Sequence, residues 1–161
     1  EGIYFYSGFM FFYNLGRTQK MPGSVQEIRF INRDEKTHLW LFRQIIKELQ
    51  AEHPDMFTPE KIEVYRDMIR QGTDQEIEWG KYVIGDAIPG LNTQMIVDYI
   101  SYLGNLRCSE LGFGTIYEGH EKEPDTMFWV EQYANANMIK TDFFEARNTA
   151  YAKSTAMNDD L

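Results

Sequence analysis

The first fifteen residues, EGIYFYSGFMFFYNL, are apolar on nearly every face that a helix would present. A helix at a protein surface carries one apolar stripe, whereas a helix that is apolar all round must be surrounded by protein. The stretch is shorter than the roughly 20 residues that a membrane-spanning helix needs. We therefore expect a core helix over residues 1–15, and no association with a membrane.

The rest of the chain shows the helical period in its longer segments and no alternating strand pattern. Helix-capping residues predict where these helices begin: Ser24, Thr58, and either Asn92 or Thr93. A break is possible at Gly72. The expected helices span 24–51, 58–85, 92–111 and, for a short one, 127–133. This pattern predicts an all-α fold, an antiparallel helical bundle with short connections.

The composition excludes some functions and divides the chain into two parts. A net charge of −9 with no basic stripe argues against binding nucleic acid, whose phosphates are bound by Lys and Arg. The single cysteine, Cys108, cannot form an internal disulfide and fits the reducing cytoplasm. We expect a helical part over 1–142 and a flexible, small and polar tail over 143–161.

Two polar residues occupy positions of the second expected helix where its period calls for apolar ones. Glu35 and His38 fall on the stripe formed by Ile28, Ile31, Phe42, Ile45 and Leu49. An unpaired buried charge is costly, so such groups are paired or bound to a metal. At spacing i, i+3 their side chains share one face of the helix and form an oxygen–nitrogen platform for a metal ion.

The first helix carries a carboxylate at the head of a similar stripe, Glu1 followed by Phe5, Phe9 and Phe12. An antiparallel pair of helices could bring Glu1 level with Glu35 and His38. Ferritin-like dimetal proteins use one Glu from each of two helices and a Glu-x-x-His from each of two others. The chain therefore contains half of such a ligand set.

Simpler interpretations exist for each of these residues. A lone Glu-x-x-His occurs by chance in many helices, and a buried Glu35–His38 pair can form only a hydrogen bond. Taken alone, Glu1 would be a solvated carboxylate. His53 and His120 lie in polar loops and are not expected to be ligands.

Four stretches carry a more specific pattern: EGIYFYSGF, INRDEKTHL, GLNTQMIVDYISYLGNLRCSELG and the terminal FFEARNTAYAKSTAMNDDL. Together they resemble one family, the class I ribonucleotide reductase small subunit. The resemblance is to the C-terminal half of that subunit and extends over essentially all 161 residues. It implies half of a ferritin-like bundle, and a part in reducing ribonucleotides to deoxyribonucleotides.

The resemblance implies that Glu1, Glu35 and His38 are three of six ligands of a dinuclear metal centre. The centre would be Fe/Fe or Mn/Fe, since the position that distinguishes the two lies in the other half. Asp34 matches an aspartate that hydrogen-bonds a metal-bound histidine and belongs to the electron and proton path. The alternative for Asp34 is an ion pair with Arg33 or Lys36.

The resemblance also assigns residues that surround the centre and that connect it to a partner. Phe5, Phe9 and Ile31 match apolar residues that line the pocket of the oxidised centre and keep water out. Tyr151 matches the tail tyrosine that relays the radical to the large subunit, and Glu145 matches an acidic residue upstream of it. The terminal NDDL resembles the end of the tail that docks on that subunit.

The resemblance covers only half of the family's bundle, which implies a partner for this chain. The N-terminal half of the small subunit would supply the remaining ligands and the usual radical tyrosine. A split gene, a proteolysed subunit and a partial sequence all fit. We also expect a small-subunit dimer. The rival functions are another ferritin-like oxidase or monooxygenase, which would not need Tyr151, and a metal-free helical scaffold or regulatory paralogue.

Overall fold

The computed structural model describes residues 2–134, and this part of the chain is folded into helices without a β-strand. In chain order the elements are α1 (Tyr6–Arg17), α2 (Pro22–Glu52), η1 (Pro54–Phe57), α3 (Pro59–Val83), α4 (Thr93–Glu110), η2 (Asp125–Met127) and α5 (Phe128–Ala134). Three of the helices, α2, α3 and α4, are longer than the rest, and two short 3-10 helices lie between α2 and α3 and directly before α5.

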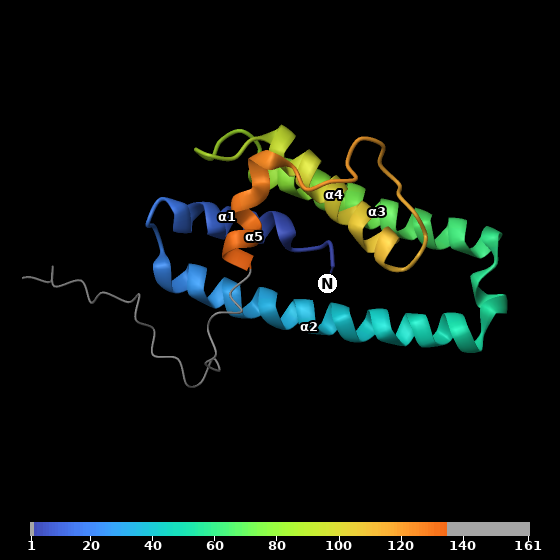
Figure 1. Cartoon of the computed structure of the whole chain (residues 1–161). Helices are drawn as coiled ribbons and strands as arrows, with labels where there is room; N and C mark the ends of the chain where they lie inside the picture. The colour runs from blue at the N-terminus through green and yellow to red at the C-terminus, as the bar shows by residue number, and fades with distance from the viewer. Residues whose placement is uncertain (1, 135–161) are drawn as a thin grey trace, which may run out of the picture.

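The helices form two layers with α1 between them (Figure 1). Helix α2 runs antiparallel to α3, to which η1 joins it, and α4 packs along α3. Helix α1 contacts α2 on one side and both α3 and α4 on the other, and α5 contacts α1 and α2. The predicted all-α fold is confirmed for the described residues.

Two helix starts lie where the capping residues predicted them. The Thr58 hydroxyl accepts the backbone N–H three residues on, at 3.5 Å, and α3 follows. The Asn92 side chain does the same at 2.8 Å for α4. These caps satisfy N–H groups that have no partner within the helix. The break considered at Gly72 does not occur, and α3 continues through it.

Two other helix starts differ from the prediction. The helix expected from residue 1 begins only at Tyr6, because Phe5 has a left-handed backbone with φ 75°. Phe5 therefore lies outside the helix that carries Phe9. Helix α2 begins at Pro22 rather than after Ser24, since the fixed φ of proline suits the first helical position.

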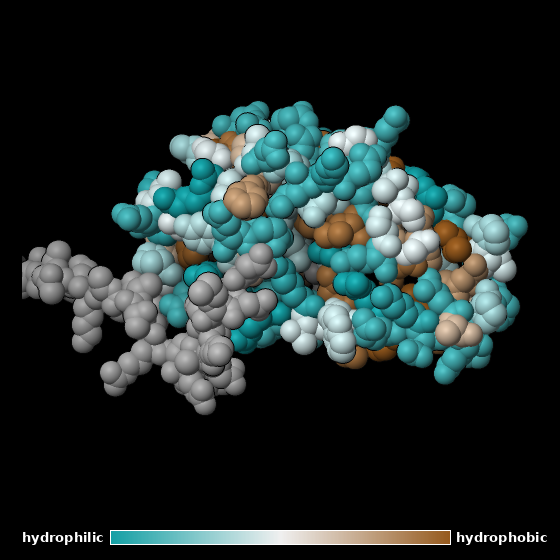
Figure 2. Space-filling model, in the orientation of Figure 1, coloured by the Kyte–Doolittle hydropathy of each residue, from teal (hydrophilic) through white to brown (hydrophobic). Residues whose placement is uncertain are grey.

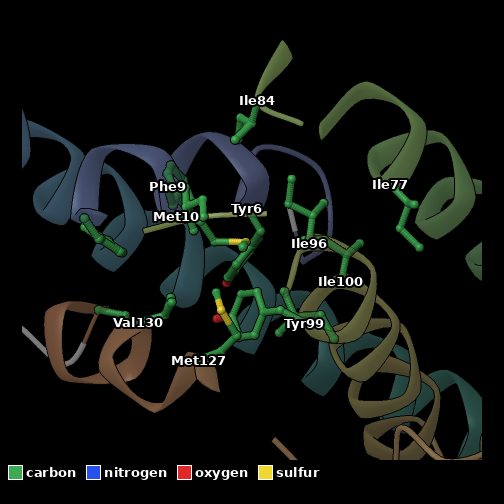
Figure 3. Packing of buried hydrophobic residues seen from close by; sticks show 14 of the residues in the cluster. Tyr6, Phe9, Met10, Ile77, Ile84, Ile96, Tyr99, Ile100, Met127 and Val130 are labelled. Carbon is green, nitrogen blue, oxygen red and sulfur yellow. The ribbon is translucent and has the colours of Figure 1, made fainter. Parts of the chain in front are cut away.

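The core fills the space where α1, α3, α4 and α5 meet (Figure 3). Helices α1, α3 and α4 approach closely at Gly80, where a Cβ atom would lie 2.7 Å from the Ser7 hydroxyl and 2.8 Å from Ile96. The cluster comprises Tyr6, Phe9, Met10, Tyr13, Val25, Ile77, Ile84, Leu91, Ile96, Tyr99, Ile100, Leu103, Met127, Val130 and Ala134.

The surface is largely hydrophilic, but hydrophobic residues reach it between α2 and the α3–α4 layer (Figure 2). In the part of the chain that the structure describes, no helix combines the length and the apolar character needed to cross a bilayer. The tail expected over 143–161 lies outside the described residues.

Candidate metal centre

The Glu35 and His38 side chains lie together on α2, as their spacing predicted. Nδ1 of His38 lies 3.4 Å from Oε2 of Glu35. The Glu35 side chain is 21% exposed and that of His38 is 51% exposed. Two potential metal ligands thus lie side by side, and both side chains are partly exposed on the surface of the described part of the chain.

This pair has the chemistry and spacing of two ligands of one metal ion. Carboxylate oxygen and imidazole nitrogen both suit iron and manganese. Ligand atoms that each lie about 2.1 Å from an ion are separated by roughly 3.0–3.4 Å. The residues therefore fit half of a metal site. Within 2–134, no three His, Cys, Asp or Glu side chains are grouped so that they could hold an ion.

The apolar stripe beside this pair is not in the core, contrary to the sequence prediction. Ile31, Phe42 and Ile45 are 46%, 54% and 44% exposed. Helix α2 instead turns another face to the described core, with Val25 and Asn32 buried on it. The helical period correctly identified an apolar face of α2 and predicted that it would be buried, but no described element covers this face. Exposed apolar residues gathered on one face are typical of interaction surfaces.

The three residues expected to line an apolar pocket have different surroundings. Phe9 is 4% exposed and packs edge-on against Tyr6, with ring centroids 5.3 Å apart. Ile31 is on the exposed stripe. Phe5 is 62% exposed and borders an open cavity of about 430 Å³ between the segment that precedes α1 and helix α3. Only Phe9 is enclosed by described residues, and the pocket-lining role remains a prediction for all three.

Asp34 is exposed and pairs with its neighbour Arg33 at 3.0 Å. This is the ion pair considered as the alternative for that residue. Its expected contact with a metal-bound histidine stays a prediction. Glu1, Glu145 and Tyr151 lie outside the described residues.

A buried carboxylate that the sequence analysis missed holds the start of α1. Oε1 of Glu76, on α3, accepts the backbone N–H of Ser7 at 2.9 Å, and Glu76 is only 4% exposed. Because Phe5 offers no capping side chain, Glu76 takes the place of an N-cap from another helix. A glutamate between Thr73 and Gly80 on the inner face of α3 was the available signal.

Three tyrosines of the hydrophobic core, Tyr6, Tyr13 and Tyr99, stay protonated at neutral pH. Burial raises the pKa of Tyr13 to about 12, although the Asn32 amide donates a hydrogen bond of 2.7 Å to its hydroxyl and opposes the shift. Burial also raises the pKa of Tyr6, against the nearby Arg107 guanidinium, and that of Tyr99 well above its usual range.

Comparison with known proteins agrees with the resemblance drawn from the sequence. The model of the family "Ribonucleotide reductase, small chain" matches residues 1–124. The ribonucleoside-diphosphate reductase subunit beta of Treponema pallidum is 72% identical over 161 residues, 100% of this chain and 46% of that protein. The subunit beta of Halalkalibacterium halodurans is 42% identical over 158 residues, 98% of this chain and 45% of the relative.

Solved structures give the same result for the fold. The ribonucleotide reductase R2 subunit from Clostridium botulinum matches with a TM-score of 0.78 and 47% identity, over 83% of this chain and 41% of the other. A putative class I ribonucleotide reductase from Bacillus halodurans matches with a TM-score of 0.76 and 42% identity, over 82% and 46%. The fold is therefore part of the ferritin-like bundle of these subunits.

The chain spans about half the length of the relatives it matches. The family match covers most of the chain, and the fold, the helix carrying Glu35 and His38 and the relatives all agree with it. The chain belongs to the ribonucleotide reductase small-chain family.

Proposed function

We propose that this chain forms part of the small subunit of a ribonucleoside-diphosphate reductase and contributes Glu1, Glu35 and His38 to a dinuclear metal centre. The observation that carries the proposal is the pair of Glu35 and His38, 3.4 Å apart beside an exposed apolar stripe. The names of the relatives support the substrate class, ribonucleoside diphosphates.

The metal, Fe/Fe or Mn/Fe, would supply an oxidising equivalent derived from oxygen when it is bound. Glu1, Glu35 and His38 would hold it. Phe5, Phe9 and, once the exposed stripe is covered, Ile31 would exclude water from its surroundings. The Asp34 carboxylate can accept a hydrogen bond from the imidazole N–H of a ligand histidine, which would fix the orientation of that ring.

The proposal includes the partners of the chain. The remaining half of the small subunit, on a separate chain or a missing segment, would cover the stripe that contains Ile31, Phe42 and Ile45. The tail over 143–161 would dock on the large subunit, with Tyr151 passing the oxidising equivalent across and Glu145 lying upstream of it. We also propose a small-subunit dimer and a cytoplasmic setting, which the free, buried Cys108 fits.

Two substitutions in the full-length subunit test this function against its rivals. Tyr151→Phe should leave the metal content unchanged and abolish the reduction of nucleoside diphosphates by the mixture with the large subunit. Glu35→Ala should abolish both. Undiminished reduction by Tyr151→Phe would refute the relay, and would leave another ferritin-like oxidase as the better interpretation. Equal metal content in Glu35→Ala and the wild type would show that Glu35 is not a ligand, and a wild type without metal would favour a metal-free scaffold.

A further inference from the structure

The segment before α1 is held by an arginine from a distant helix. Nε of Arg107, on α4, donates a hydrogen bond of 2.9 Å to the backbone carbonyl of Gly2, across 105 residues of sequence. The Arg107 side chain is only 12% exposed. A hydrogen bond from a charged donor in such a place is stronger than one at the surface.

The Gly2 carbonyl needs this donor because it lies outside the helix. Within a helix, the N–H of Tyr6 would bond the carbonyl four residues before it, which is that of Gly2. Instead the N–H of Tyr6 lies 3.4 Å from the carbonyl of Ile3, and α1 begins only afterwards. Arg107 therefore supplies the partner that a helix would have supplied.

The same place leaves little room for a side chain at residue 2. A Cβ atom on Gly2 would lie 3.0 Å from Nε of Arg107 and 3.0 Å from Cδ1 of Leu39. Leu39 is on α2 and follows His38 directly. The backbone at Gly2 thus passes between α4 and the part of α2 that carries the Glu35–His38 pair.

A bridge of charges fixes Arg107 relative to α2. Nη1 of Arg107 lies 3.1 Å from Oε2 of Glu110, and the other carboxylate oxygen of Glu110 lies 3.0 Å from Nη1 of Arg43, on α2. The planar guanidinium of Arg107 serves Gly2 with one N–H and Glu110 with another, which a lysine ammonium cannot do in the same geometry.

We propose that Arg107 is a positioning residue for Glu1: by holding the Gly2 carbonyl in place between α4 and α2, it sets the backbone from which the Glu1 carboxylate reaches the metal shared with Glu35 and His38. The inference rests on the proposed function. Metal ligands need to be held within about 0.5 Å, and a non-helical segment achieves this only through such contacts from other elements.

The test is a titration of the metal-free, full-length subunit with Mn²⁺ alone, in which the electron paramagnetic resonance signal of the free ion gives the dissociation constants. Arg107→Met keeps most of the buried stem and removes both donors. Arg43→Met is the matched control, because it also removes one positive charge and one of the two partners of Glu110, but does not touch Gly2. Thermal unfolding of both variants measures how much stability each substitution costs, apart from its effect on metal binding.

Arg107→Met is expected to weaken Mn²⁺ binding at one site or more by roughly 10- to 100-fold, as for partners that orient metal ligands. Arg43→Met should weaken Mn²⁺ binding far less, although it should lower the thermal stability by a similar amount to Arg107→Met. Equal binding by Arg107→Met and the wild type, or equal weakening in both variants, would overturn the inference. Should Arg107→Met not fold, Gly2→Ala and Arg107→Lys carry the same expectation of weakened binding, and wild-type affinity in both would refute it.

The variant Glu35→Ala distinguishes a failure of the role proposed for Arg107 from a failure of the metal site in the proposed function. If the wild type binds no Mn²⁺, or if Glu35→Ala binds it as the wild type does, the metal site itself is wrong and the role of Arg107 falls with it. If Glu35→Ala loses binding while Arg107→Met keeps it, only the role of Arg107 is wrong.

Discussion

The exposed stripe of α2 allows a prediction whose size follows from the structure. Phe42 is 54% exposed in the described part of the chain. If the rest of the subunit covers the stripe, Phe42 is fully buried in the complete protein, and its truncation to alanine costs about 3–5 kcal/mol of unfolding free energy. If nothing covers it, only about half of the side chain is removed from water and the cost is roughly 1–2 kcal/mol.

Denaturant unfolding of the full-length subunit distinguishes the two cases. Trp40→Ala is the matched control, because Trp40 precedes Phe42 by two positions, lies on the opposite side of α2 and is 58% exposed. We expect Phe42→Ala to cost at least about 1 kcal/mol more than Trp40→Ala. Equal costs for the two variants would refute the conclusion that the stripe is an internal interface.

Three further predictions concern the described residues. Glu76→Ala leaves the buried N–H of Ser7 without its acceptor and should cost about 1–3 kcal/mol, with faster hydrogen exchange at that amide; unchanged protection would contradict the cap. Tyr13 should lower the unfolding free energy by about 2 kcal/mol as the pH rises from 10 to 12, because its raised pKa lets the unfolded chain lose this proton first. Tyr13→Phe should flatten this decline, and an unaltered slope would refute the assignment. Asn105→Ala removes four hydrogen bonds of 2.7–2.9 Å to the backbone of residues 116–120 and should cost about 2–4 kcal/mol in urea unfolding; a loss under about 1 kcal/mol would show that the loop does not depend on it.

The sequence predicted well those features whose causes are local. Thr58 and Asn92 cap their helices through atoms three residues away, so the residue types alone locate α3 and α4. Glu35 and His38 meet because one helix carries both. Such contacts require nothing beyond the periodicity of the helix.

The errors arose where distant residues decide the outcome. The start of α1 depends on Glu76, 69 residues beyond Ser7, and the backbone before it depends on Arg107. No period in the first fifteen residues encodes either contact. The period also showed that α2 has an apolar face at Phe42, but it could not show that the described elements leave this face uncovered.

The most direct test of the account is the metal content of the full-length subunit, purified without denaturation, beside that of Glu35→Ala. Because six ligands of a dinuclear centre are expected and Glu35 is one of them, the account predicts about two metal ions per subunit in the wild type and a clear loss in the variant. The same metal content in both proteins, or none in the wild type, would contradict it.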